Sequence, residues 1–281
     1  MADFGNTGPM VRLDWPLPQV ARITLDRGAE FNTLTYEMLA ALDTEIEAAE
    51  AGGARVAIVT GSGRTFCGGA HVKYFTEPDA PLKGNPRALR NDYVRPIIDV
   101  FAKLHDMSFV SIAAINGFAL GGGCELALAC DFRLMSAAAR IGLTEVRLGA
   151  LAAAGGVQLL SKIVGRAKAL EIALLGDQWG AEDAARVGLV NAVHAPDALE
   201  GAALALAQRL LMCSPVSVAE TRRAIYRCET ASAAEADEIA LDAMTAAASG
   251  KEWWEGMAAF TQKRTPDFAL SGKTDGKAGI A

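Results

Sequence analysis

The stretch Ala114-Ile-Asn-Gly-Phe-Ala-Leu-Gly-Gly-Gly-Cys-Glu-Leu-Ala-Leu-Ala-Cys-Asp131 joins an apolar segment to three consecutive glycines and then to a run of good helix formers. This order predicts a buried strand, a glycine turn and a helix beginning at Cys124. Consecutive glycines let the backbone approach a ligand closely, and the free N–H groups of a first helical turn attract negative charge. We therefore expect an oxyanion to be stabilised here, although a tight turn without a ligand has the same local pattern.

Length and composition favour one large α/β domain with a smaller appendage. The 281 residues carry a net charge of −6 with both signs interspersed, which disfavours nucleic acid and anionic membranes as partners. We find no apolar run suited to crossing a bilayer and no secretory pattern at the N-terminus, so we expect a cytoplasmic protein without a membrane partner. Five cysteines without a C-x-x-C pair indicate reduced thiols.

Predicted strands and helices alternate through the first two thirds of the chain. Strands are expected at 11–15, 20–25, 55–60, 109–115, 132–136 and 189–193. Helices are expected at 35–51, 92–104, 157–164, 166–174 and 181–186, and residues 76–92 are typical of a surface loop.

The last third is helical from 198 to 268, with breaks near 214–215 and 249–250. The sequence therefore predicts four parts: a lead-in at 1–10, a core domain at 11–195, a helical region at 196–268 and a mobile tail at 269–281.

Two glycine-rich loops each follow a predicted buried strand, at residues 61–70 and 121–123. Neither matches a phosphate-binding loop or a well-placed dinucleotide fingerprint. Together they can direct one backbone N–H each at a single carbonyl oxygen, which is the arrangement of an oxyanion hole.

Glu125 and Glu145 are the candidate acid–base pair, because one opens a helix behind the glycines and the other lies between apolar residues. The alternative for Glu145 is a solvated loop glutamate beside Arg147. His71 is an acid, a base, a polar wall or a residue without a catalytic task. The sequence shows no nucleophile motif, and its three histidines have no metal-ligand spacing, so we predict no metal site.

Six ordered segments resemble the crotonase superfamily, whose best-known member is enoyl-CoA hydratase. The resemblance runs from about residue 11 to 268, and the segments are 23–34, 66–70, 116–131, 145–156, 181–191 and 255–264. It implies an α/β fold, a crotonase-like spiral of ββα repeats with two roughly perpendicular sheets. It also implies a C-terminal helical region for trimerisation, in a homotrimer or a hexamer made of two trimers.

The resemblance further implies an acyl-CoA thioester substrate and reversible hydration of a 2-enoyl-CoA to a 3-hydroxyacyl-CoA. The oxyanion hole is then expected at the N–H groups of Ala70 and Gly122. Glu125 is expected to activate water at the β-carbon, and Glu145 to protonate the α-carbon. Coenzyme A is part of the substrate, so no separate cofactor is expected.

The residues expected near the substrate or its CoA are Arg27, Phe66, Gly68, His71, Gly121, Ala153, Phe260 and Lys263. The chain departs from the family where His71 replaces a usual aspartate, where Cys67-Gly68 replaces the usual small residues, where Thr144 replaces a frequent proline, and where residues 150–154 replace a segment that commonly contains Pro-Gly. A straight, branched, carboxylated or hydroxylated acyl group is compatible with these changes.

Two other functions remain open from the sequence. One is an enoyl-CoA isomerase or another enolate-forming acyl-CoA enzyme. The other is a non-catalytic scaffold that binds CoA thioesters or a protein partner, against which the presence of both glutamates argues.

Overall fold

The computed structural model describes residues 8–80 and 82–268. The first seven residues of the predicted lead-in and the whole predicted tail at 269–281 lie outside the described residues. The chain forms two compact units, the first ending at Leu204 and the second beginning at Ala205.

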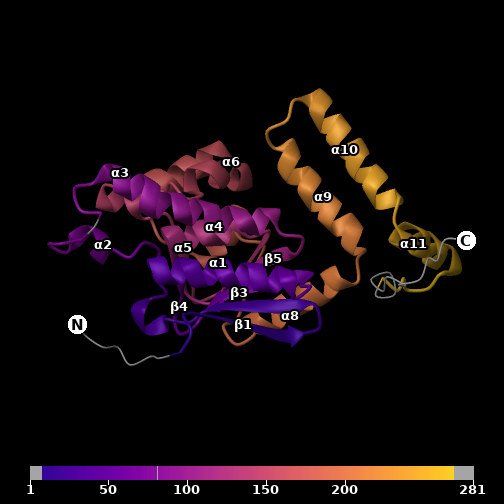
Figure 1. Cartoon of the computed structure of the whole chain (residues 1–281), viewed down its shortest axis with the longest axis horizontal. Helices are drawn as coiled ribbons and strands as arrows, with labels where there is room; N and C mark the ends of the chain where they lie inside the picture. The colour runs from indigo at the N-terminus through magenta and orange to yellow at the C-terminus, as the bar shows by residue number, and fades with distance from the viewer. Residues whose placement is uncertain (1–7, 81, 269–281) are drawn as a thin grey trace, which may run out of the picture. The chain divides into compact units, whose positions relative to one another are not determined.

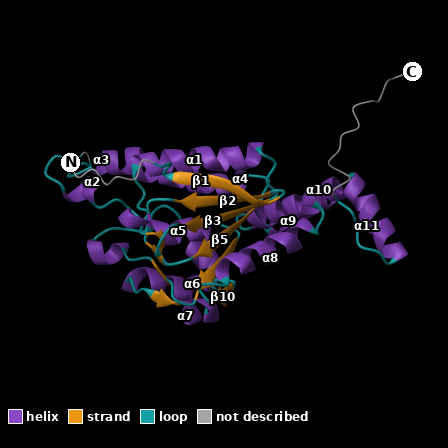
Figure 2. Ribbon diagram, turned by 90° about the horizontal axis from the view of Figure 1, so that it is seen from below, coloured by secondary structure: helices purple, strands orange, loops and turns teal. Residues whose placement is uncertain are grey.

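The first unit is built on a six-stranded sheet whose central strands are covered on both faces. Its order is β1 (Val11–Leu17), β2 (Val20–Leu25), β3 (Val56–Gly61), β5 (Val110–Ile115), β7 (Phe132–Ser136) and β10 (Ala192–His194). Only the β1–β2 pair is antiparallel. Every residue of β5 is buried, as expected for a continuous apolar run in a parallel strand. Figure 2 shows these strands side by side.

The first unit also contains a second sheet, of four short strands. Its order is β4 (Thr65–Cys67), β6 (Phe118–Leu120), β8 (Arg140–Gly142) and β9 (Trp179–Gly180). The predicted α/β class is confirmed. The predicted order of strand, glycine turn and helix omitted β6, because Asn116-Gly117 turns the chain into this strand before the three consecutive glycines, and the helix begins at Gly122 rather than at Cys124. Strands of two or three residues are too short to show a period of two in the sequence.

Seven α-helices of the first unit connect or cover these strands: α1 (Tyr36–Ala51), α2 (Lys73–Thr76), α3 (Pro86–Ala88), α4 (Arg95–Asp106), α5 (Gly122–Ala129), α6 (Gly156–Leu175) and α7 (Ala181–Arg186). Short 3₁₀ turns occupy Gly28–Glu30 and Glu145–Leu148, and a π-helix occupies Leu89–Val94. The expected surface loop at 76–92 was therefore wrong in part. The predicted break between 164 and 166 is confirmed, since Gly165 interrupts α6 with a φ of 75°.

Helix α1 shows why the sequence pattern succeeds where an element is long. The Thr35 hydroxyl caps the helix by accepting the Met38 N–H at 3.1 Å. The apolar positions at helical spacing, Met38, Leu39, Leu42, Ile46 and Ala49, are all buried. The helix packs on β1 and β2, and Figure 1 shows α1 running beside β1.

The second unit is helical, as predicted. Helix α8 (Leu199–Leu211) ends in it, followed by α9 (Pro215–Cys228), α10 (Ala233–Ala248) and α11 (Lys251–Gln262). The predicted breaks near 214–215 and 249–250 are confirmed. A third break before α10 was not predicted, although its signal is present: the Ser232 hydroxyl and the Glu235 carboxylate form a capping box. Among the described residues, no single helix has the length and apolarity to cross a bilayer, and one bent pair, α8 with α9, meets both conditions only jointly.

Two glycine substitutions test the packing of the fold. A β-carbon on Gly123 would lie 1.9 Å from the Cys67 carbonyl oxygen, whereas one on Gly201 in α8 meets nothing within 4 Å. We expect Gly123→Ala to cost more than about 3 kcal/mol of unfolding free energy, since backbone must move. Gly201→Ala should add about 0.5–1 kcal/mol by removing chain entropy. Urea unfolding measures both, and a wild-type midpoint for Gly123→Ala would contradict the packing.

Candidate functional site

The start of α5 places Gly122 beside the glycine-rich loop at 61–70. Gly121 precedes the helix with a φ of 54°, a left-handed conformation that favours glycine. A β-carbon on Gly122 would lie 3.8 Å from the Ala70 nitrogen, so the two predicted oxyanion donors are neighbours. Within residues 8–80 and 82–268, neither N–H donates to another group of the chain. The structure therefore brings together two free backbone donors from separate loops.

Glu125 lies in the first turn of α5 and is only 4% exposed. Its Oε1 accepts the Ala154 N–H at 2.7 Å and the Gly156 N–H at 3.0 Å. Burial raises the pKa of Glu125 to about 7, the two N–H groups oppose that rise, and the charge of Glu145 adds to it. A carboxyl with this pKa exchanges a proton readily near neutral pH.

Glu145 opens the 3₁₀ turn after β8, and its side chain approaches the same helix start. A β-carbon on Gly121 would lie 3.1 Å from Glu145 Oε1. Its Oε2 is buried and has no hydrogen-bond partner among the described residues. Burial raises the pKa of Glu145, which favours its protonated form. The alternative of a loop glutamate near Arg147 is not supported, because Arg147 instead pairs with Asp177 and donates to the Leu175 carbonyl at 2.9 Å.

The other residues predicted near the substrate fall into three environments. Arg27 donates to the carbonyls of Gly8 and Pro9 at 2.6 and 2.9 Å, so its guanidinium holds the N-terminal segment. The Phe66 side chain is fully buried in the core. Phe260 is 84% exposed and, like Lys263, belongs to the second unit.

Two predicted neighbours, Gly68 and Ala153, lie near the glycine loops or the glutamates. The Gly68 N–H donates to the Phe31 carbonyl at 2.8 Å. This bond ties the glycine-rich loop at 61–70 to the loop at 27–32. The Ala153 carbonyl accepts from the Gln158 amide at 2.6 Å, one residue before the Ala154 N–H that binds Glu125.

His71 follows the oxyanion alanine and is held on both its ring and its backbone. Its Nδ1 lies 3.0 Å from the Thr33 hydroxyl, and its ring meets the Tyr74 ring edge-on. Burial, together with the nearby Lys73, lowers the pKa of His71 and favours the neutral imidazole. The arrangement is that of a polar wall anchored to the loop.

Asn32 has a structural role that the sequence did not reveal. It is fully buried, its amide nitrogen donates to the carbonyls of Thr65 and Phe66 at 2.8 and 3.3 Å, and its Oδ1 accepts the Arg27 N–H at 2.8 Å. One side chain thus joins the loop at 27–32 to β4. An asparagine within a loop is the only sequence signal, and it is not specific.

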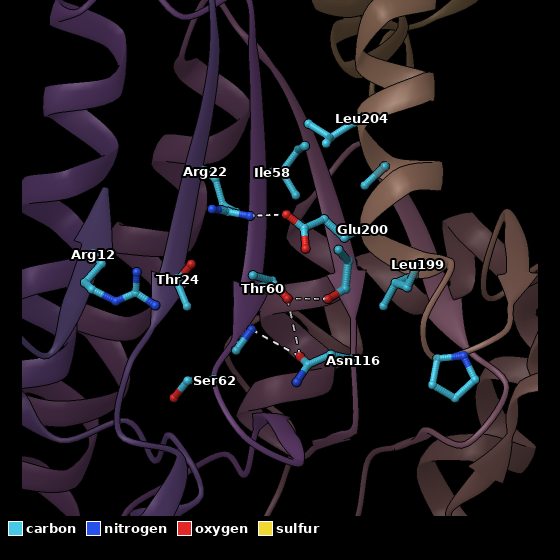
Figure 3. Close-up of a pocket in the computed structure, with 14 residues that line it drawn as sticks. Arg12, Arg22, Thr24, Ile58, Thr60, Ser62, Asn116, Leu199, Glu200 and Leu204 are labelled. Carbon is cyan, nitrogen blue, oxygen red and sulfur yellow. Dashed lines mark hydrogen bonds and ion pairs between the residues drawn. The ribbon is translucent and has the colours of Figure 1, made fainter. Parts of the chain in front are cut away.

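A separate cavity of about 350 Å³ lies among β2, β3, β5 and the start of α8 (Figure 3). Its two arginines are neutralised: Arg12 pairs with Asp26 at 2.7 Å, and Arg22 pairs with Asp14 and Glu200. Neither catalytic candidate lines it, and we assign it no part in the chemistry.

Comparison with known proteins agrees with this geometry. A family model described as enoyl-CoA hydratase/isomerase matches residues 18–271. The chain is 37% identical over 253 residues to the 2,3-dehydroadipyl-CoA hydratase of Escherichia coli K12, covering 89% of this chain and 95% of that protein. It is 33% identical over 248 residues to the short-chain-enoyl-CoA hydratase of Clostridium acetobutylicum, covering 88% and 92%. The crystal structure of enoyl-CoA hydratase from Bacillus anthracis superposes with a TM-score of 0.86 at 32% identity, covering 94% of this chain and all of that one.

The raised pKa of Glu125 has a consequence for stability. Below its ordinary pKa of 4.5 the carboxyl is protonated in both the folded and the unfolded chain. As the pH rises to about 7 the unfolded chain ionises first, so the folded state loses on the order of 3 kcal/mol relative to low pH. Glu125→Gln removes this loss. Its melting temperature relative to wild type should therefore increase between about pH 5 and about pH 8.

Glu182→Gln, at an exposed position in α7, controls for the loss of one negative charge. If the Glu125→Gln difference is flat across this pH range, Glu125 is not a buried carboxyl of raised pKa.

Proposed function

The chain belongs to the enoyl-CoA hydratase/isomerase family and is an acyl-CoA hydratase, and we propose that Glu125 and Glu145 add water across the double bond of its 2-enoyl-CoA substrate. The observation that carries this assignment is the pair itself. Glu125 is buried, its pKa is raised to about 7, and it is electrostatically coupled to a second carboxyl of raised pKa. Two such groups can divide the work of base and acid.

In the hydration direction Glu125 is ionised and Glu145 carries a proton. Glu125 takes a proton from water as the water oxygen bonds to the β-carbon, and the π electrons move onto the thioester oxygen. Glu145 then gives its proton to the α-carbon as the carbonyl re-forms. The reaction leaves Glu125 protonated and Glu145 ionised, and proton exchange restores the pair. Because the two carboxyls interact, their titration belongs to the pair.

The developing charge on the thioester oxygen needs donors that are in place before the reaction. We assign these to the N–H groups of Ala70 and Gly122, which are neighbours and lack acceptors within the described chain. The Gly122 donor also lies at the positive end of α5. Such donors stabilise the enolate-like state more than the neutral carbonyl.

The proposal extends to assembly and location. Unit two carries exposed apolar side chains on successive helices, namely Ile225, Leu241, Met244, Trp254 and Phe260. Their exposure supports association into a trimer or a hexamer, because large apolar groups are normally covered in a soluble protein. We further propose that the enzyme is cytoplasmic and uses no cofactor besides the CoA of its substrate.

Substitution of each glutamate tests the division of labour. Glu125→Gln and Glu145→Gln each keep the shape of the side chain but abolish proton exchange, so kcat should fall about 10²- to 10⁴-fold. The loss of enoyl-thioester absorbance on hydration of crotonyl-CoA measures the rate. Glu182→Gln should retain wild-type turnover. An active Glu125→Gln, Glu145→Gln double variant would remove the pair from the mechanism.

Solvent labelling separates hydration from isomerisation. In water enriched in ¹⁸O, the product should be a 3-hydroxyacyl-CoA that carries one solvent oxygen, since water is the nucleophile. An isomerase would move the double bond without taking up ¹⁸O. Mass spectrometry of the product over a panel of enoyl-CoA chains decides between them, and a scaffold would give no product with any chain.

A further inference from the structure

The direction of the Ala70 N–H is set by bonds on either side of it. The Gly69 carbonyl, in the same peptide unit, accepts the Leu34 N–H at 2.9 Å. Because this peptide is trans, its carbonyl and its N–H point in opposite directions, and the Ala70 N–H points away from Leu34. The next peptide is fixed through the His71 N–H, which donates to the Tyr93 hydroxyl at 2.9 Å.

The Tyr93 hydroxyl joins this loop to the segment beside it. It donates to the Leu34 carbonyl at 2.6 Å while it accepts the His71 N–H. The bond to the Leu34 carbonyl requires the neutral hydroxyl, and burial raises the pKa of Tyr93. The two peptides that flank Ala70 are therefore tied, directly or through one oxygen, to the same residue, Leu34.

The Tyr93 ring is held as firmly as its hydroxyl. The side chain is 1% exposed, and its ring meets those of Tyr36, Tyr74 and Phe75 edge-on at 5.7 Å between centroids. An oxygen on so constrained a ring can serve as a fixed point for the loop.

The local backbone explains how Tyr93 reaches this position. It lies in the π-helix at 89–94, where the Arg95 N–H bonds the Arg90 carbonyl five residues back. Pro96 follows, and a proline has no N–H and excludes the carbonyl four residues before it. The wider π-turn accommodates the missing N–H of Pro96. Such π-turns are frequent at functional sites.

We propose that Tyr93 is a positioning residue of the oxyanion hole, whose hydroxyl aims the Ala70 N–H at the thioester oxygen. The inference rests on the proposed function, in which Ala70 supplies one of the two donors. Without the hydroxyl, the His71 N–H and the Leu34 carbonyl lose their shared partner. Leu34 and Ala70 pair as a parallel bridge, in which the His71 N–H already faces the Leu34 carbonyl. Loss of the oxygen between these two groups would let them close on each other, and the shift of the Ala70–His71 peptide would tilt the adjoining Ala70 N–H.

Tyr93→Phe tests the proposal because it removes one oxygen and keeps the ring. We expect kcat for crotonyl-CoA to fall about 10- to 100-fold with KM within about twofold, since the donor acts mainly on the transition state. The second readout is the red shift of an aromatic enoyl-CoA probe on binding, which reports polarisation of its thioester carbonyl. The red shift should be smaller in Tyr93→Phe than in wild type. If Tyr93 served only to stabilise the fold, the folded fraction of the variant would show the wild-type red shift.

Tyr74→Phe is the matched control, because its hydroxyl accepts the Tyr36 N–H at 3.3 Å and contacts no peptide next to Ala70. It should retain both turnover and red shift. If Tyr93→Phe does not fold, 3-fluorotyrosine at position 93 keeps the ring and the oxygen but weakens the oxygen as an acceptor, and a smaller red shift is again expected.

The outcomes separate the two hypotheses. Wild-type turnover and red shift in the position-93 variants would overturn the role of Tyr93 alone. A wild-type protein that neither hydrates enoyl-CoA nor shifts the probe would overturn the proposed function, and the role of Tyr93 with it.

Discussion

The close contact between the start of α5 and the loop after β4 is the constraint on which the site depends. At Gly123 a single β-carbon would overlap the Cys67 carbonyl, and a β-carbon on Gly122 would lie 3.5 Å from the Gly69 Cα. This contact puts two backbone donors from distant parts of the sequence side by side. It also packs α5, the helix that bears Glu125, against the small sheet, so the chemistry and the packing require the same glycines.

Burial of Glu125 is the electrostatic consequence of that packing. Desolvation alone would favour the neutral acid strongly, and the N–H groups of Ala154 and Gly156 offset part of this cost by binding Oε1. The balance leaves a pKa of about 7, where either protonation state is accessible. Neighbouring Glu145 works in the same direction, since a second negative charge nearby disfavours ionisation of the first. Helix packing and carboxylate coupling together produce a group suited to taking and returning a proton.

The sequence predicted what depends on long periodic patterns and on side chains of unusual local context. The buried face of α1, the alternation of strands and helices and the two glycine loops follow from such patterns. The pairing of Glu125 with Glu145 was a candidate from local context, and the family resemblance favoured it over a solvated loop glutamate. The small sheet was missed because Phe118–Leu120 and Arg140–Gly142 are too short to show alternation. Tyr93 was missed for a different reason: its function depends on a π-turn and on partners 22 and 59 residues away, which no local window contains.

Residues 150–154 connect the two glutamates directly. The Ala150 N–H donates to the Glu145 carbonyl at 3.0 Å, and the Ala154 N–H donates to the Glu125 carboxylate at 2.7 Å. A proline at 154 would have no N–H for the second bond. Ala152 and Ala154 are buried while Leu151 is 64% exposed, so the segment is pinned at both ends and on one face. Its alanines therefore help to set the relative placement of the two carboxyls, and a change of backbone here would alter the geometry of proton transfer before it altered the contacts of an acyl chain.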